Sequence, residues 1–289
     1  MAKNVKIVIT GGSGFVARHL RNYLSKQNIE LISISRNNFR KFKNESRFIS
    51  KNYNEEDFLK KIKNADALIH LVGIGRQSTK IDYNTVNVEF TKHVVNLCKK
   101  AKISKFVYTS GLGVSSNTSL GYFISKYKAE KAIINSGLNY TIFRPSYIVG
   151  KDDPFTKYLK KQIKNGKIII PGSGSYSIQP IYIKDVAEII FQSITKKIFQ
   201  NKILDLVGPE YITFEQYVKL FSKKTRTSIK KINLEEAYFN AINHSKSDFG
   251  VDDLNILIGN FQGNHKKLKQ ISQIKFESIL KLLESGRLL

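Results

Sequence analysis

The stretch KIVITGGSGFVARHL (Lys6–Leu20) decides the fold of this chain of 289 residues. It begins as an apolar run of strand-forming residues, passes through a glycine-rich turn and continues with apolar residues at helical spacing. Gly11 permits a tight turn, Gly14 lets the backbone approach a pyrophosphate at a helix N-terminus, and Ala17 allows a helix to pack closely on a strand. The pattern predicts a strand–turn–helix unit that binds a dinucleotide, with an ordinary strand–helix turn as the alternative.

The same alternation continues over the first 150 residues. Strands are expected at Lys6–Thr10, Glu30–Ser35, Arg47–Ser50, Ala67–Gly73, Lys105–Ser110 and Tyr140–Arg144, and helices at Val16–Lys26, Asn54–Asn64, Tyr83–Ala101 and Tyr122–Ser136. Nearly continuous apolar strands that alternate with helices are typical of parallel strands joined by crossover helices. The sequence therefore predicts an α/β fold with a Rossmann-type doubly wound parallel sheet.

After Gly150 the alternation loosens, which suggests two parts. Helices are expected at Phe155–Asn165 and Thr213–Lys223, a turn-rich stretch at Ile168–Ser175, a strand running into a helix at Ile178–Ile190 and a strand at Leu204–Val207. The last 60 or so residues are rich in lysine and weakly patterned. We expect a dinucleotide-binding domain over residues 1–150 and a smaller substrate-side lobe over 151–289, which includes a returning strand and helix near 178–207.

The composition is that of a globular chain with an excess of positive charge. Hydrophobic residues make up 41%, and the net charge is +25. Such a charge indicates either a polyanionic partner or a compositional bias. The 39 lysines against 9 arginines favour the bias, because readers of nucleic acid rely on arginine for bidentate contacts. We expect no specific nucleic-acid partner, and we expect a basic rim to assist an anionic ligand at most.

Other features limit the remaining function classes. No run of residues approaches the ~18 apolar positions of a membrane span, so we expect a cytoplasmic protein. The single cysteine, Cys98, excludes a disulfide framework and is expected in the core. The five histidines lack ligand spacing, so no metal is expected, and His70 is interpreted as a core residue.

The residues after the second expected strand indicate which dinucleotide is bound. A carboxylate at that position would bind the ribose 2′-hydroxyl of NAD, but this chain has Ser35 followed by Arg36. A guanidinium suits the 2′-phosphate of NADP, so NADP(H) is preferred over NAD(H), although Arg36 could be one more surface cation. Further cofactor contacts are expected around the glycine-rich turn, at Gly11, Ser13, Gly14, Phe15 and Val16.

A tyrosine and a lysine four residues apart share one face of a helix, where the ammonium group lowers the pKa of the phenol. Such a tyrosine can exchange a proton with a carbonyl or an alcohol. Three pairs have this spacing: Tyr122/Lys126, Tyr127/Lys131 and Tyr147/Lys151. We favour the first pair, because Tyr122 opens the helix after the fifth strand, beside the sheet edge where cofactors bind.

With these residues in place, the chain resembles the extended or atypical short-chain dehydrogenases/reductases of the epimerase/dehydratase-like group. It is also similar to the nucleotide-binding accessory subunit of respiratory complex I and to NmrA-like redox sensors. The resemblance covers about the first 210 residues. It rests on TGGSGFVA (Thr10–Ala17), HLVG (His70–Gly73), NVEFT (Asn87–Thr91), FVYTS (Phe106–Ser110), YFISKYKAE (Tyr122–Glu130), FRPSYIVG (Phe143–Gly150) and IYIKDVA (Ile181–Ala187).

The resemblance implies a role for several residues. Tyr122 would be the general acid/base, and Lys126 would bind the nicotinamide ribose and lower the pKa of Tyr122. Gly73 would pack near the cofactor ribose, and Pro145 would lead the backbone past the nicotinamide. The hydroxyl that polarises the substrate carbonyl in the family aligns with Gly111, so Ser110 or Ser115 would have to replace it; Asn52 stands where relatives often carry an aspartate near the adenine.

These observations support two functions. The first is an NAD(P)-dependent oxidoreductase or epimerase/dehydratase-like enzyme that transfers hydride at a carbonyl or secondary alcohol, with Tyr122 moving the proton. The second is a non-catalytic NADP(H)-binding redox sensor or assembly subunit. The partner is expected to be a small-molecule substrate. Arg76, after the fourth strand, either binds an anionic substrate or is simply solvated.

Overall fold

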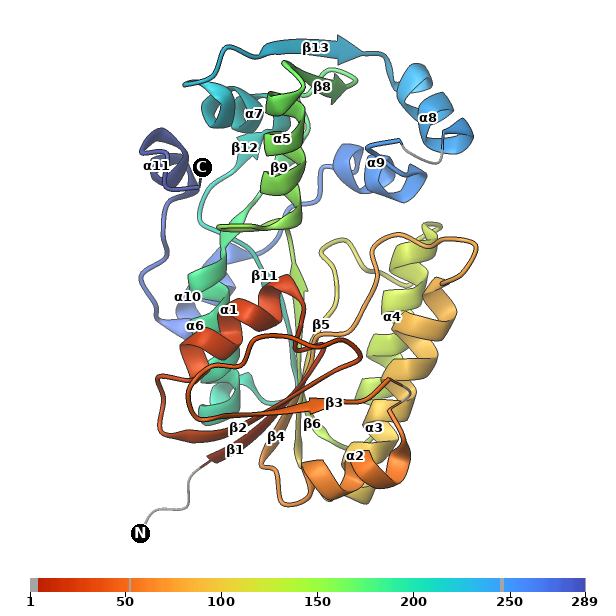
Figure 1. The fold of residues 1–289 in the computed structure, drawn as a ribbon, viewed down its shortest axis with the longest axis vertical. Coiled ribbons are helices and arrows are strands. Elements are labelled where there is room, and N and C mark those ends of the chain that lie inside the picture. The colour runs from red at the N-terminus through yellow and green to blue at the C-terminus, as the bar shows by residue number, and fades with distance from the viewer. Residues whose placement is uncertain (1–4, 52, 245–246, 289) are drawn as a thin grey trace.

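A seven-stranded parallel sheet forms the centre of the computed structural model, which describes residues 5–51, 53–244 and 247–288. In spatial order the strands are β11 (Lys202–Leu206), β6 (Asn139–Pro145), β5 (Lys105–Thr109), β4 (Ala67–His70), β1 (Val5–Thr10), β2 (Ile29–Ser35) and β3 (Glu45–Ile49). From β1 the strands β2 and β3 are added toward one edge of the sheet, and β4, β5, β6 and β11 are added toward the other edge (Figure 1). The strand order therefore reverses between β1 and β4. Ligands of such sheets bind beyond the carboxyl ends of the strands at this switch point.

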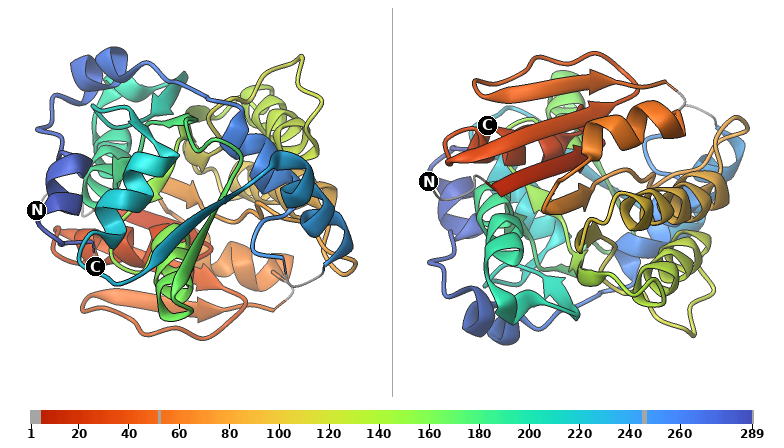
Figure 2. Two further views of the ribbon diagram at one scale, coloured as in Figure 1. Left: turned by 90° about the horizontal axis from the view of Figure 1, so that it is seen from above. Right: turned by 90° about the horizontal axis from the view of Figure 1, so that it is seen from below.

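Helices cover both faces of the sheet, as the views from above and below also show (Figure 2). One face carries α1 (Phe15–Leu24), α6 (Ile183–Thr195) and α10 (His265–Ser272), and the other carries α2 (Glu55–Ile62), α3 (Phe90–Lys100) and α4 (Gly121–Ile134). Alternate residues of β1 supply both cores: Ile7 and Ile9 join the first cluster, and Val8 joins the second. The Rossmann-type doubly wound sheet expected from the sequence is confirmed.

A lobe with its own apolar cluster lies beyond the carboxyl ends of the strands (Figure 1). Its helices are α5 (Pro154–Lys164), α7 (Phe214–Ser222), α8 (Leu234–Asn243), α9 (Val251–Ile258) and α11 (Ile279–Glu284). The short 3-10 helix η2 (Lys197–Phe199) follows α6 in the sheet layers and is not part of this lobe. Its strands pair as β7 (Ile148–Val149) with β10 (Ile181–Tyr182), β9 (Ser177–Ile178) with β12 (Ile212–Thr213), and β8 (Lys167–Pro171) with β13 (Ser228–Ile232). The helix α6 and the strand β11 come from the second half of the sequence but belong to the layers of the central sheet. The domain boundary at residue 150 stays a prediction.

Two local expectations differ from the structure, and one region without an expected element forms helices. The stretch expected as a turn at Ile168–Ser175 begins as strand β8, whose partner β13 lies some 60 residues further along the chain. The expected helix Tyr83–Ala101 is divided into a π-helix, η1 (Asn84–Glu89), and α3. The lysine-rich C-terminal region, which is weakly patterned, forms short helices that include α9 and α11.

The buried His70 in β4 has hydrogen-bond partners within the protein. His70 is fully buried, with Nδ1 2.7 Å from Thr10 Oγ1 and Nε2 3.2 Å from Thr91 Oγ1. Burial, with the nearby charge of Lys126, lowers the pKa of His70 to about 3, so the ring is neutral. His70 and the buried Cys98 are therefore core residues, as expected.

The described residues contain no group of three or more His, Cys, Asp and Glu side chains arranged to hold a metal ion. Along the same residues, every helix is too short or too polar to cross a bilayer.

Candidate dinucleotide and substrate site

The glycine-rich turn lies at the switch point, between β1 and α1. Gly11 has a φ of +79°, in the left-handed region that favours glycine, and a Cβ there would lie only 3.0 Å from the carbonyl carbon of Leu71. The Gly14 N–H donates to the Gly11 carbonyl at 2.9 Å, and Gly14 caps α1 through its backbone alone. The first helical turn therefore presents backbone N–H donors and the positive end of the helix dipole, which suits a dinucleotide pyrophosphate.

The end of β2 lies beside this turn. Ser35 Oγ is 2.8 Å from Ser13 Oγ, and the Arg36 side chain that follows is exposed. Burial raises the pKa of the nearby Tyr53, against the opposing charge of Arg36 and the backbone of Gly11. Arg36 follows β2 directly, and its contact with a 2′-phosphate stays a prediction. Asn52, which was expected near the adenine, lies outside the described residues.

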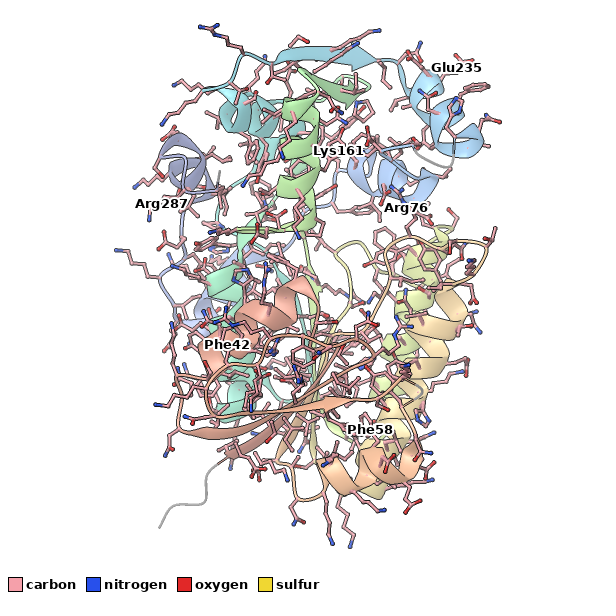
Figure 3. All side chains as sticks on the ribbon, in the orientation of Figure 1. Phe42, Phe58, Arg76, Lys161, Glu235 and Arg287 are labelled. Atoms are coloured by element: carbon pink, nitrogen blue, oxygen red, sulfur yellow. The ribbon has the colours of Figure 1, made fainter. Side chains whose placement is uncertain are left out.

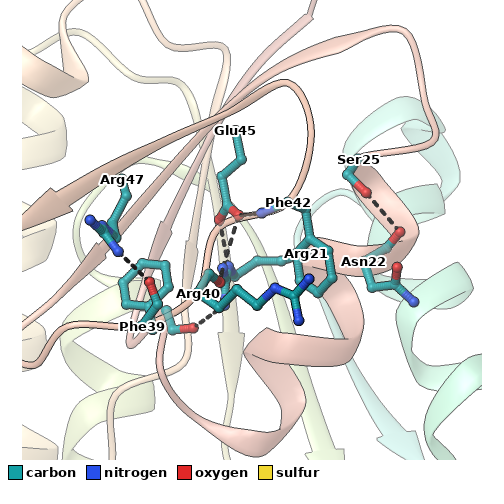
Figure 4. Close-up of polar contacts among 9 residues, drawn as sticks. Arg21, Asn22, Ser25, Phe39, Arg40, Phe42, Glu45 and Arg47 are labelled. Carbon is teal, nitrogen blue, oxygen red and sulfur yellow. Dashed lines mark hydrogen bonds and ion pairs between the residues drawn. The ribbon is translucent and has the colours of Figure 1, made fainter.

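A buried ion pair fixes the loop that follows Arg36 (Figure 4). Arg21 of α1 donates from Nε and Nη2 to Glu45 of β3 at 2.5 and 2.8 Å, and from Nη1 to the Gly12 carbonyl at 2.8 Å. Its Nη2 also donates to the carbonyl of Arg40, and its guanidinium lies 4.1 Å from the centre of the Phe39 ring. Arg21 therefore joins the glycine-rich turn, the loop and the sheet edge into one rigid unit.

Lys126 lies beneath the loop after β4. It is 5% exposed, and its Nζ donates to the Thr109 carbonyl at 3.1 Å and to the Tyr108 hydroxyl at 3.2 Å. A Cβ on Gly73 would lie 3.0 Å from this Nζ, so only glycine fits there without displacing the ammonium group. Burial lowers the pKa of Lys126 to about 8, against the opposing charge of Glu130.

Tyr122 lies one helical turn before Lys126, on the cavity side of α4. Its ring meets the ring of Tyr83 edge to face, with the centroids 5.9 Å apart. Burial raises the pKa of Tyr122 to about 12, and Lys126 Nζ lies 6.0 Å from the centre of its ring. The expected lowering of the phenol pKa by Lys126 is therefore wrong for the ligand-free protein: desolvation dominates, and the ammonium group is directed at Tyr108 and Thr109 instead.

The hydroxyl expected to polarise a substrate carbonyl is missing from the position beside Tyr122. A Cβ on Gly111 would lie 3.1 Å from Tyr122 Oη, which confirms that Gly111 faces the phenol. Ser110 is 4% exposed, its Oγ has no hydrogen-bond partner among the described residues, and it does not line the cavity. Ser115 is exposed on the loop. Two serines that sequence reasoning missed, Ser146 and Ser177, do line the cavity.

Asn87 of the π-helix organises the loop between β4 and the cavity. Its Oδ1 accepts from the Ile74 N–H at 2.9 Å, and its Nδ2 donates to the Ile74 carbonyl at 3.1 Å and to Ser125 Oγ at 3.0 Å. These contacts tie the loop that carries Gly73 to α4, which carries Lys126. π-Helical turns are frequent at functional sites because they redirect a side chain in this way.

A cavity of about 420 Å³ separates the sheet edge from the lobe. Tyr122 and Gly111 form part of its wall on the sheet side, together with Pro145 at the end of β6. The lobe side is built by residues from α5, α7 and α9. The Tyr122 hydroxyl lies beside Gly111, which also lines the cavity.

Two contacts join α9 to the loop after β4. The Tyr83 hydroxyl donates to Asp252 Oδ2 at 2.6 Å, and the Arg76 guanidinium pairs with Asp253 and donates to the Asp248 carbonyl at 3.2 Å. Arg76 thus points toward the lobe, beneath α9 (Figure 3). Arg76 lines the cavity, as expected for a substrate residue, but its charge is matched by Asp253. Neither aspartate was found from the sequence, since the region around α9 shows little pattern.

The structure brings most of the expected residues into one continuous line. Gly11 meets Leu71 of the β4 loop, the same loop presents Gly73 to Lys126, and one turn away Tyr122 faces Gly111 and the cavity. Phe15 and Val16 of α1 pack against the adjoining core cluster. Ser110 and Ser115 do not line the cavity. The residues present therefore fit a dinucleotide that runs from the glycine-rich turn toward Tyr122.

Comparisons with known proteins agree with this arrangement. The sequence model of the NAD dependent epimerase/dehydratase family matches residues 7–205. A curated relative is the mitochondrial NADH dehydrogenase [ubiquinone] 1 alpha subcomplex subunit 9 of Dictyostelium discoideum, 23% identical over 235 residues. The match covers 78% of this chain and 65% of that relative, which is less than two thirds of its length. The cytoplasmic location expected here stays a prediction, because the relative is named as mitochondrial.

Solved structures share the fold over nearly the whole chain. A UDP-N-acetylglucosamine 4-epimerase from Methanobrevibacter ruminantium M1, in complex with UDP-N-acetylmuramic acid, is 18% identical, with a TM-score of 0.75 over 99% of this chain and 97% of that one. A UDP-glucuronic acid 4-epimerase from Bacillus cereus, in complex with a UDP-sugar and NAD, is 18% identical, with a TM-score of 0.76 over 98% and 97%. The fold, the glycine-rich turn and the match over residues 7–205 together show that this chain belongs to the NAD-dependent epimerase/dehydratase family.

Proposed function

We propose that this protein is an NADP(H)-dependent oxidoreductase that interconverts a carbonyl and a secondary alcohol, with Tyr122 as the proton donor and acceptor. The observation that carries the proposal is the placement of Tyr122 in the wall of the cavity. It lies one helical turn from the buried Lys126, whose Nζ lies beside Gly73 in the loop after β4. Structures with this fold include one that contains NAD. The exposed Arg36 beside the glycine-rich turn favours the 2′-phosphate of NADP(H) over NAD(H).

The bound nicotinamide would supply or accept the hydride. Tyr122 is protonated at neutral pH, because burial raises its pKa to about 12, so it is ready to donate to a carbonyl oxygen. Lys126 keeps a positive charge close to the phenol below pH about 8, which stabilises the phenolate that forms when the proton leaves. Gly73 leaves room for the ammonium group to contact a ribose hydroxyl.

The proposal is tested by replacing Tyr122 alone. Purified protein is mixed with NADPH and a panel of ketones and aldehydes, and NADPH oxidation is followed by absorbance. We expect Tyr122→Phe to lower kcat by about 100-fold or more, because general acid catalysis contributes about 10²–10⁴-fold. Tyr127→Phe, five residues further along α4, serves as the matched control and keeps its rate. A Tyr122→Phe variant with full turnover would refute the catalytic role.

A second function is favoured by Gly111. Because this position lacks the carbonyl-polarising hydroxyl, the chain could hold a dinucleotide without turnover, as a redox sensor or an assembly subunit. The Dictyostelium discoideum relative, named as a subunit of NADH dehydrogenase, is consistent with such a role. This function predicts tight binding of NADP(H), no turnover across the carbonyl panel, and partner chains that co-purify with the protein.

A further inference from the structure

The cavity beside Tyr122 is lined mainly by apolar side chains, which do not suit a ligand that carries phosphate. The residues that form it beyond Tyr122 are mainly aromatic and aliphatic, including Tyr147, Phe155, Tyr158, Phe214, Phe249 and Phe261. Several of these rings contact one another, with Phe155 5.4 Å from Phe214 and Tyr158 5.2 Å from Phe249, centroid to centroid. Burial also raises the pKa of Tyr147 and Tyr158, as expected for a poorly solvated interior.

The charges at the cavity are already matched within the protein. Among the described residues that line it, Arg76 is the one cation, and its guanidinium is paired with Asp253. Asp248 is the second acidic residue in the lining; it accepts from Gln162 Nε2 at 2.6 Å and pairs with Lys161 at 3.4 Å. The lining therefore contains more acid than base, although the whole chain carries a net charge of +25.

Two helix N-termini at the cavity carry acidic capping side chains. At α5, Asp153 Oδ1 accepts from the Thr156 N–H at 2.8 Å, and Oδ2 accepts from the Gly150 N–H at 3.0 Å. At α9, Asp253 Oδ2 accepts from the Gly250 N–H, at the N-cap, at 2.8 Å. Asp153 thus occupies one N–H of the first turn of α5, and both carboxylates would repel a phosphate group.

We propose that this cavity binds an uncharged carbonyl compound with an apolar body, such as a long-chain ketone, rather than a nucleotide sugar. This inference rests on the proposed function and specifies the substrate class of the same site. A diphosphate placed here would lose its hydration without gaining an unpaired cation, which is strongly unfavourable. An alkyl chain would instead bury its surface against the aromatic rings, with its one carbonyl at the Tyr122 hydroxyl.

The first test uses a series of 2-alkanones from 2-hexanone to 2-decanone, titrated into the full chain by calorimetry. The titrations are run with and without saturating NADP⁺, which leaves no hydride to transfer. Each added methylene is expected to tighten binding about threefold to fourfold, because burial of a CH₂ contributes about 0.8 kcal/mol. UDP-glucose is titrated in parallel and is expected to bind more weakly than 2-decanone.

The second test compares two aliphatic positions on α9. Ile256 lines the cavity, whereas Val251 lies at the start of the helix, 40% exposed and outside the cavity lining. Ile256→Ser is expected to weaken 2-decanone binding about fivefold to tenfold, whereas Val251→Ser leaves it unchanged. Both variants should retain affinity for NADP⁺, which shows that they are folded.

Two results would overturn the inference: UDP-glucose that binds more tightly than 2-decanone, or ketone affinities that do not depend on chain length. Either can occur while NADP⁺ still binds and Tyr122→Phe still abolishes turnover, so the proposed function would survive it. Conversely, chain-length-dependent ketone binding without any affinity for NADP⁺ supports the cavity inference and counts against the proposed function alone.

Discussion

At the scale of single residues, burial shifts the pKa values of Tyr122 and Lys126 in opposite directions. Both are withdrawn from water, and the same desolvation raises the pKa of the phenol to about 12 and lowers the pKa of the ammonium group to about 8. Both shifts favour the neutral forms. The helical spacing of the pair could be recognised in the sequence, but the direction of the Tyr122 shift could not, because its burial against Tyr83 and Gly111 is a tertiary effect.

The pH dependence of turnover follows from the lowered pKa of Lys126. Its charge is present below pH about 8 and is lost above it, whereas Tyr122 stays protonated throughout that range. We expect kcat/KM for ketone reduction to be level below pH about 8 and to fall above it. Steady-state rates across this range provide the measurement. Lys126→Met should be slow and lack the inflection; an unmodified protein whose rate rises through pH about 8 would contradict this assignment.

Gly73 offers a test of the cofactor route at one atom. Gly73→Ala places a methyl group 3.0 Å from Lys126 Nζ and 3.2 Å from Asn87 Oδ1, so one of these groups must move. We expect NADPH affinity to fall about tenfold, or about 1.4 kcal/mol, by fluorescence titration. Gly75→Ala in the same loop is the control, since a Cβ there meets no atom within 4 Å. Equal affinity of the two variants would show that Gly73 is not beside the cofactor.

At the scale of elements, the Arg21–Glu45 pair connects α1 to β3 and holds the loop between β2 and β3. Glu45→Gln leaves the Arg21 guanidinium buried without its counter-charge, so we expect a loss of about 3–5 kcal/mol in the free energy of unfolding, measured in urea. Glu56→Gln, which removes an exposed pair with Lys60, should cost less than about 1 kcal/mol. Similar losses in the two variants would mean that the buried pair contributes little.

The same pair carries a pH signature. Although burial opposes it, hydrogen bonding to Arg21, Ser33 and the Phe42 N–H holds the pKa of Glu45 below its ordinary value of 4.5. The stabilisation is therefore present above pH about 4.5 and is lost as the pH falls through the lowered pKa of the folded state. Glu45→Gln should lose this part of the acid dependence of stability.

Local sequence signals located most elements of the sheet layers. Apolar runs identified all seven strands of the sheet. The expected helices at Asn54 and Thr213 begin with side chains of these residues that accept from the N–H groups of Asp57 and Gln216. The pairing of β8 with β13 could not be predicted, because it depends on a non-local register. The role of α9 was missed for a related reason: Asp252 and Asp253 acquire meaning only when folding places them against Tyr83 and Arg76.

At the scale of the whole molecule, charge and site are separated. The chain carries a net charge of +25, yet the described cavity lining contains two acidic residues and one paired cation. The expected phosphate contacts lie elsewhere, at the glycine-rich turn and Arg36. These residues are contiguous in the sequence, so their role could be proposed from the sequence alone. The cavity, which α5, α7 and α9 assemble from distant segments, required the structure.

The central claim, that a phosphorylated dinucleotide binds between the glycine-rich turn and Tyr122, is tested most directly by titrating the protein with NADPH and NADH. Bound nicotinamide fluorescence and the shift in unfolding temperature are followed together, since a ligand at 100 times its Kd adds about 2.7 kcal/mol of stability. We predict that both nucleotides bind, NADPH more tightly, and that Arg36→Gln removes the difference whereas Arg40→Gln preserves it. Failure of both nucleotides to bind or stabilise the protein at about 1 mM would contradict the account.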